Sequence, residues 1–177
     1  FLGGTVSGFN IVTEKDTKTI RSMAVTPLKM RTYLFSRGIV AVLTSIAIGL
    51  LSALILSGAS IEYSKLIISL FASGPLVVII TLLIGKMADN QINSIAAIKL
   101  IMPVYLTLPL AALFIPEKFL FILYPLPNFW AFQSFQHIFL SERTLNDFYL
   151  ANTILFVLGS VVLVVLSKIF KKHFGLR

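Results

Sequence analysis

The chain has 177 residues, of which 57% are hydrophobic and only 12% are charged, and its formal net charge at pH 7 is +8. Since an average globular protein has about 25% charged residues, this composition argues against a soluble enzyme, a disordered tail and a nucleic-acid-binding domain. The mean hydropathy of +0.94 and several long apolar runs instead predict a polytopic membrane protein. The absence of cysteine excludes disulfides, thiolate zinc sites and cysteine nucleophiles.

The first apolar stretch, residues 1–12, is too short to cross a bilayer. As a helix it extends about 18 Å, whereas the hydrocarbon core of a bilayer is about 30 Å thick. The chain begins with Phe1 rather than with methionine or a basic signal-peptide segment. We therefore expect the numbering to begin inside a span whose upstream part is missing.

Four further segments lack formal charges over 16 to 24 residues and predict membrane-spanning helices. They are residues 38–61, 66–85, 100–115 and 148–167. The expected fold is all-α: a single transmembrane domain over residues 1–177, with about four full spans, a truncated first span and an external re-entrant hairpin.

The hairpin is predicted for residues 119–138, which are apolar but contain Pro125 and Pro127 among many aromatic side chains. Proline interrupts the helical hydrogen-bond ladder, and unsatisfied backbone cannot face lipid, so this segment is either re-entrant or a distorted span. If it is re-entrant, 12 Lys and Arg residues lie in the cytoplasm and 3 lie outside; if it spans, the division is 9 to 6. The positive-inside rule favours the first arrangement. It makes residues 116–147 an external region, places the C-terminus in the cytoplasm and explains the net charge without a nucleic-acid partner.

Residues typical of catalysis or metal binding are few and scattered. The two histidines, His137 and His173, lie in different segments, and the sequence has neither an H-E-x-x-H motif nor a G-x-x-x-x-G-K-[ST] phosphate loop. No ionisable residue lies at the centre of a predicted span, where it would mark an ion or proton path. We therefore predict no catalytic, cofactor-binding or metal-binding residues.

The basic stretch of residues 13–37 is the most informative part of the chain. Ile20, Met23 and Leu28 recur at helical spacing with basic residues between them, which predicts a short amphipathic helix along the membrane surface. Pro27 would end this helix. Two interpretations remain open: a basic surface helix that only sets the orientation, or a docking element against which a cytoplasmic partner pushes.

The same stretch resembles part of a known family. Residues 14–28 have an acidic start, a threonine-rich turn and the sequence VTPL at residues 25–28, and they resemble the segment after the second span in membrane permeases of type-2 ABC exporters. The order of the later spans, the external re-entrant region and the basic C-terminal end are also similar to this family. In one respect the chain differs: Lys18 stands where the family usually has glycine before the threonine, here Thr19. The resemblance alone therefore does not imply the tight turn that glycine permits.

The resemblance implies the membrane subunit of an ATP-driven exporter in the inner membrane, and not an enzyme. The implied partners are a cytoplasmic ABC ATPase that binds the ATP, a second permease copy and the lipid bilayer, without a cofactor in the permease itself. Because the spans are uncharged, we expect a hydrophobic or amphipathic substrate such as a drug, a lipid-linked sugar or a peptide. The residues expected to couple the permease to the ATPase are Glu14, Thr19, Arg21, Met23, Val25, Pro27 and Leu28. Residues 87–98 form a second cytoplasmic loop and a weaker candidate contact.

The resemblance also implies that the aromatic hairpin forms an external gate, built from Tyr124, Pro125, Pro127, Phe129 and Trp130. The alternative is that these side chains form an interfacial aromatic belt. Two other functions remain open. One is a structural or immunity-type membrane protein without an ATPase partner, in which changes to residues 14–28 would be harmless. The other is a membrane-embedded enzyme, which would need a cluster of acidic or histidine residues that this sequence lacks.

Overall fold

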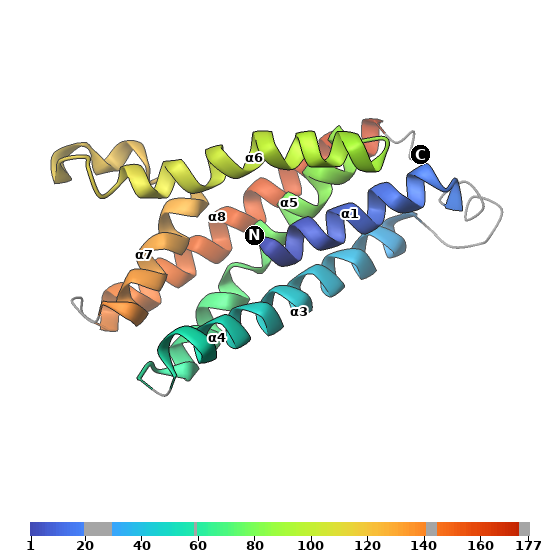
Figure 1. The fold of residues 1–177 in the computed structure, drawn as a ribbon. Coiled ribbons are helices and arrows are strands. Elements are labelled where there is room, and N and C mark those ends of the chain that lie inside the picture. The colour runs from blue at the N-terminus through green and yellow to red at the C-terminus, as the bar shows by residue number, and fades with distance from the viewer. Residues whose placement is uncertain (20–29, 59, 141–144, 174–177) are drawn as a thin grey trace.

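The computed structural model describes residues 1–19, 30–58, 60–140 and 145–173, and the regular elements in these ranges are helices (Figure 1). The predicted all-α fold is confirmed there. In chain order the elements are α1 (Leu2–Asp16), α3 (Met30–Ser57), α4 (Tyr63–Ala72), α5 (Gly74–Met87), α6 (Gln91–Ala111), the 3-10 helix η1 (Glu117–Ile122), α7 (Pro127–Phe139) and α8 (Leu145–His173).

Among these helices, α3, α6 and α8 are each long and apolar enough to cross a membrane. The pair α4 and α5 passes the same test together, with a bend of 44° between them. These make up to four spans, which agrees with the four full spans predicted. Figure 1 shows α3, the α4–α5 pair, α6 and α8 running alternately between the two ends of the bundle. Helix α1 packs against α3, α5 and α6.

The bend between α4 and α5 divides the segment that the sequence predicts as one span, residues 66–85. Ser73 lies at the break and Pro75 lies in the first turn of α5. Proline has no backbone N–H and its ring crowds the preceding turn. Residue 75 therefore cannot donate the hydrogen bond that the Phe71 carbonyl oxygen would accept in a continuous helix. The bend follows from this one residue.

Glycine lets α1 approach α5 closely. A Cβ atom on Gly4 would lie 2.8 Å from the carbonyl oxygen of Val77, and one on Gly8 would lie 2.8 Å from Cβ of Ile84. The Gly4 carbonyl also accepts a hydrogen bond of 3.1 Å from the Thr81 hydroxyl of α5. Two glycines four residues apart form the small-residue pattern that brings membrane helices into contact. The short first helix is thus seated against the bundle along its length.

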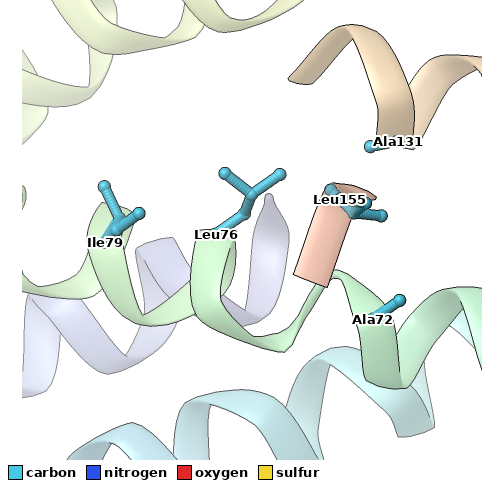
Figure 2. Packing of buried hydrophobic residues seen from close by; sticks show 5 residues of the cluster. All are labelled: Ala72, Leu76, Ile79, Ala131 and Leu155. Atoms are coloured by element: carbon cyan, nitrogen blue, oxygen red, sulfur yellow. The ribbon is translucent and has the colours of Figure 1, made fainter. Parts of the chain in front are cut away.

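The core joins the bent pair to the last two helices. Figure 2 shows Ala72 of α4, with Leu76 and Ile79 of α5, near Ala131 of α7 and Leu155 of α8. All five side chains are buried, and Leu155 is completely inaccessible. Lipid is as apolar as these side chains, so the contact stabilises the bundle through close packing rather than through removal of water.

Helix α6 begins earlier than the predicted span of residues 100–115. Its first residue is Gln91, and the side chain of Asn90 caps it by accepting a 2.8 Å hydrogen bond from the backbone N–H of Asn93. Much of the predicted loop of residues 87–98 is therefore helical. The reason is that Lys99 limits the apolar stretch in the sequence but does not interrupt a helix, so charge predicts the membrane boundary and not the helix end.

Residues 119–138 do not form one continuous helix. They contain most of η1, a turn and α7, and α7 has 13 residues, which extend only about 20 Å. In Figure 1, α6 ends and α8 begins at the same end of the bundle, with α7 between them. The side of the membrane on which this end lies stays a prediction.

Candidate functional site

The end of α1 is tied to two other helices by adjacent charged residues. The Glu14 carboxylate forms an ion pair with Arg37 of α3 and accepts a hydrogen bond from the Tyr33 hydroxyl. The ammonium group of Lys15 donates to the carbonyl oxygens of Gly85 and Ala88 at the end of α5. Neighbouring residues on a helix point about 100° apart, so Glu14 and Lys15 are directed toward different helices. We call this arrangement the α1 clamp.

The two halves of the clamp are partly shielded from solvent. The side chains of Glu14 and Arg37 are 20% and 27% exposed, and that of Lys15 is 19% exposed. The Lys15 bonds are 3.0 and 2.8 Å long and satisfy carbonyl groups that lack partners at a helix end, where a positive charge also complements the helix dipole. Lys15 also lies 3.0 Å from Asp89, but that side chain is 85% exposed, so this ion pair adds little.

Only two of the predicted coupling residues lie in the described part of the chain. Glu14 lies in the α1 clamp, and Thr19 is exposed beyond the end of α1, with its hydroxyl 2.8 Å from that of Thr17. The others lie outside the described residues: Arg21, Met23, Val25, Pro27 and Leu28. The clamp therefore contains the first residues of the predicted coupling region, residues 13–31, and α3 begins at Met30 near the end of that region.

Lys18 adopts the left-handed conformation, with φ at 59°. This is the region that glycine enters without steric cost and that other L-residues rarely enter. Lys18 thus adopts the turn conformation that glycine permits, although it stands where the family usually has glycine. The turn follows α1 directly.

The predicted gate residues are partly brought together. The rings of Tyr124, Phe129 and Trp130 have centroids 5.4 to 5.6 Å apart, with Phe129 and Trp130 edge to face. The indole N–H of Trp130 donates to the carbonyl oxygen of Tyr124 at 2.8 Å. Pro127 is buried at the first position of α7, where its missing N–H costs nothing, and Pro125 is exposed in the preceding turn. The three rings form an aromatic cluster held by a fixed turn.

A cavity of about 410 Å³ opens beside the aromatic cluster. It lies between η1, α7 and the start of α8, and its lining combines aromatic, apolar and polar side chains. They are Leu120, Tyr124, Phe129, Trp130, Gln133, His137, Asp147, Leu150 and Ala151. The clamp and this cavity lie at opposite ends of the bundle (Figure 1).

A buried polar network connects α4, α7 and α8 near the cavity. The hydroxyl groups of Ser69 and Ser134 lie 2.6 Å apart, and the Ser134 hydroxyl lies 3.0 Å from the side-chain oxygen of Asn152. The Asn152 amide nitrogen donates to the carbonyl oxygen of Phe148 at 2.9 Å. Hydrogen bonds of this kind hold membrane helices together, and they fix α7 against its neighbours.

Several of these residues were not singled out from the sequence. From the sequence, Lys15 and Arg37 were interpreted only as positive charges that set the orientation in the membrane. Asn152 was interpreted only as one residue of an uncharged span. A usable signal was present for Asn152, because a buried amide inside an apolar helix needs a partner on another helix. Within the described residues, no group of three or more His, Asp or Glu side chains is arranged to hold a metal ion.

Comparison with known proteins gave one match. A protein-family model described as "Fluoroquinolones export permease protein Rv2686c-like" matches residues 1–169. Searches among curated proteins and among solved structures gave no significant match.

Proposed function

The chain belongs to the Rv2686c-like family of fluoroquinolone export permeases, and from this premise we propose that it is the membrane-spanning subunit of an ATP-driven exporter. A separate cytoplasmic ABC ATPase hydrolyses the ATP, and two permease copies enclose the transport path in the cell membrane. The exported substrate is an amphipathic aromatic drug, in keeping with the name of the family. We propose no catalytic activity for the permease itself.

The structural observation that carries the proposal is the α1 clamp. The predicted contact with the ATPase runs from Glu14 to Arg31, and the clamp connects the first residues of this region to two span helices. Glu14 connects it to α3 through Arg37, and Lys15 connects it to the end of α5. A displacement of the end of α1 would therefore be passed on to α3 and α5.

The proposal gives Glu14 and the residues beyond it different roles. We predicted from the sequence that Glu14 itself anchors the ATPase, and that contact is still a prediction. Its bonds to Tyr33 and Arg37 favour a role inside the permease, in which it transmits the displacement. Thr19 and the coupling residues beyond it would then supply the contact surface. ATP drives the cycle only if its binding favours one state of the complete exporter over the other.

The aromatic cluster at the opposite end is proposed as part of an external gate. Its rings are fixed by the bond between Trp130 and Tyr124 and by Pro127 at the start of α7. The polar network through Ser134 and Asn152 joins α7 to α8, so a change in the tilt of α8 would carry the cluster with it. This is the mechanical link that a gate requires.

The proposal is tested by purifying the full-length protein from its native membrane in mild detergent and assaying ATPase activity. We expect an ATP-binding protein to co-purify in stoichiometric amount, and its activity to rise when a fluoroquinolone is added. Export of the drug from cells should stop when ATP is depleted. A preparation without ATPase activity, together with drug export that survives ATP depletion, would overturn the proposal.

A further inference from the structure

The cavity beside the aromatic cluster has the size and the lining of a ligand site. Its volume of about 410 Å³ lies within the range of about 300–1,000 Å³ typical of pockets for small molecules. Such pockets combine apolar walls with a few polar groups that fix the orientation of the ligand. We call the side chains of Tyr124, Phe129 and Trp130 the aromatic wall of this cavity, and those of Gln133, His137 and Asp147 its polar wall.

The aromatic wall is rigid before any ligand arrives. Trp130 donates to the Tyr124 carbonyl at 2.8 Å, and its ring meets that of Phe129 edge to face at 5.4 Å. Phe129 is only 4% exposed, which holds it in place. Aromatic faces attract cations through their quadrupole and stack on planar rings, so this wall suits a ligand that has both.

The polar wall carries the charge. Among the described residues that line the cavity, Asp147 is the one with a formal charge, and it lies in the first turn of α8. An ionised carboxylate has about four lone-pair positions, so it can accept an ammonium N–H in addition to bonds within the chain. Gln133 and His137 of α7, which are 6% and 7% exposed, supply the other polar side chains of the lining.

From this combination we propose that the cavity binds a planar aromatic compound carrying a protonated amine, with the ring against Trp130 and the ammonium group at Asp147. The inference rests on the proposed function, because it assigns to the exporter a second, external contact with its substrate. An anionic ligand would face the carboxylate and be disfavoured. The groove along α3, α5 and α8 is almost wholly apolar and has no comparable feature that selects a ligand.

The test compares two probes that differ in charge but share one ring system: 1-naphthylmethylamine, which is protonated at pH 7, and 1-naphthylmethanol, which is neutral. Binding is measured by equilibrium dialysis against the full-length protein in lipid nanodiscs, with empty nanodiscs as the blank. We expect the amine to bind about tenfold more tightly than the alcohol, the scale of one hydrogen bond between an ammonium group and a carboxylate. Equal binding of the two probes would overturn the proposal.

The position of the bound amine in the cavity is tested through Trp130 and Asp147. Trp130 is the single tryptophan of these 177 residues, so a change in tryptophan emission during titration with the amine that is lost in Trp130→Phe reports on the cavity. Asp147→Asn should remove the preference for the amine, and Asp147→Glu should keep it. The matched control is Glu62→Gln, which removes an exposed carboxylate outside the cavity and should leave the preference unchanged. A preference that survives in Asp147→Asn would overturn the assignment.

If the expected binding is not seen, two other causes can be recognised separately: a variant that does not fold, and a protein that is not an ATP-driven exporter. The Trp130 emission of each variant without probe shows whether the aromatic cluster is intact, and Asp147→Glu provides the rescue. If the ATPase co-purifies but the two naphthyl probes bind equally, the cavity assignment falls and the exporter remains. If the amine is preferred but no ATPase activity co-purifies and drug export survives ATP depletion, the exporter proposal falls and the binding site remains.

Discussion

The Glu14 carboxylate at the end of α1 is paired with the Arg37 guanidinium at the start of α3. In the sequence, most of the residues that we propose contact the ATPase lie between these two, so the ion pair links the helices on either side of them. A displacement of the end of α1 would therefore be passed on to α3.

We predict that the charges of this pair can be exchanged. Glu14→Arg alone should abolish drug export while membrane insertion is unchanged, because a second cation would face Arg37. The double variant Glu14→Arg with Arg37→Glu should recover a substantial part of the export, because the pair is restored. Export is measured in cells that contain equal amounts of each protein. If the single variant exports normally, or if the exchange recovers nothing, Glu14 does not act through Arg37.

Lys15 gives a second prediction, on stability. Lys15→Met retains an unbranched chain of similar length but removes the donor to the carbonyl groups of Gly85 and Ala88. Hydrogen bonds to a charged group contribute about 1.5–3 kcal/mol, and partial exposure reduces this, so we expect a loss of about 1–2 kcal/mol in the free energy of unfolding, measured by denaturant titration in detergent.

The matched control for this experiment is Lys65→Met. The Lys65 side chain is also 19% exposed, and among the described residues its ion pair is with the exposed Glu62 three residues earlier, an interaction that contributes about 0–1 kcal/mol. The control should therefore lose clearly less stability than Lys15→Met. An equal loss of unfolding free energy in the two variants would show that the hydrogen bonds from Lys15 to the α5 carbonyl groups do not stabilise the protein specifically.

The turn after α1 gives a third prediction. A left-handed conformation costs an L-residue roughly 1–2 kcal/mol, and Lys18 holds φ at 59°. Lys18→Gly should therefore raise the free energy of unfolding by about 0.5–1 kcal/mol, since part of the gain is lost to the greater freedom of glycine in the unfolded chain. Thr17→Gly, in the same turn but with φ at −74°, should lower it. A stabilisation by both variants would contradict the conformational explanation.

Close packing of α1 on α5 gives a fourth prediction. Gly8→Ala places a Cβ atom 2.8 Å from Cβ of Ile84, and overpacking of this kind typically costs about 1–3 kcal/mol. We expect a lower thermal midpoint for the detergent-solubilised protein. Gly74→Ala is the control, because its Cβ would meet Val42 at 3.5 Å, an ordinary contact. A normal midpoint for Gly8→Ala would mean that α1 and α5 separate easily.

The spans were predictable because each is a long uncharged stretch, and charge limits the apolar segments even where it does not end a helix. The bend at Ser73 was also readable in principle, since Pro75 must interrupt a continuous span. The α1 clamp was not, because nothing in the sequence says that Lys15 meets the carbonyl groups of Gly85 and Ala88, which are about 70 residues away. Such pairings depend on how α1 is seated on α5, which Gly4 and Gly8 decide. The aromatic cluster was predictable in part. Its aromatic residues were evident from the sequence, but the cavity beside them was not, because it depends on where α8 places Asp147.

The orientation of the bundle gives the last prediction. These 177 residues contain no cysteine, so a cysteine introduced among them is the sole target of a thiol reagent in this part of the protein. A cysteine at Gln136 of α7 should react with a membrane-impermeant maleimide added to intact cells, because the positive-inside rule places this end outside. A cysteine at Asp16, exposed at the opposite end of the bundle, should react only after the cells are opened. The reverse pattern would invert the topology, and it would then place the α1 clamp on the side without ATP, where no ATPase can act on it.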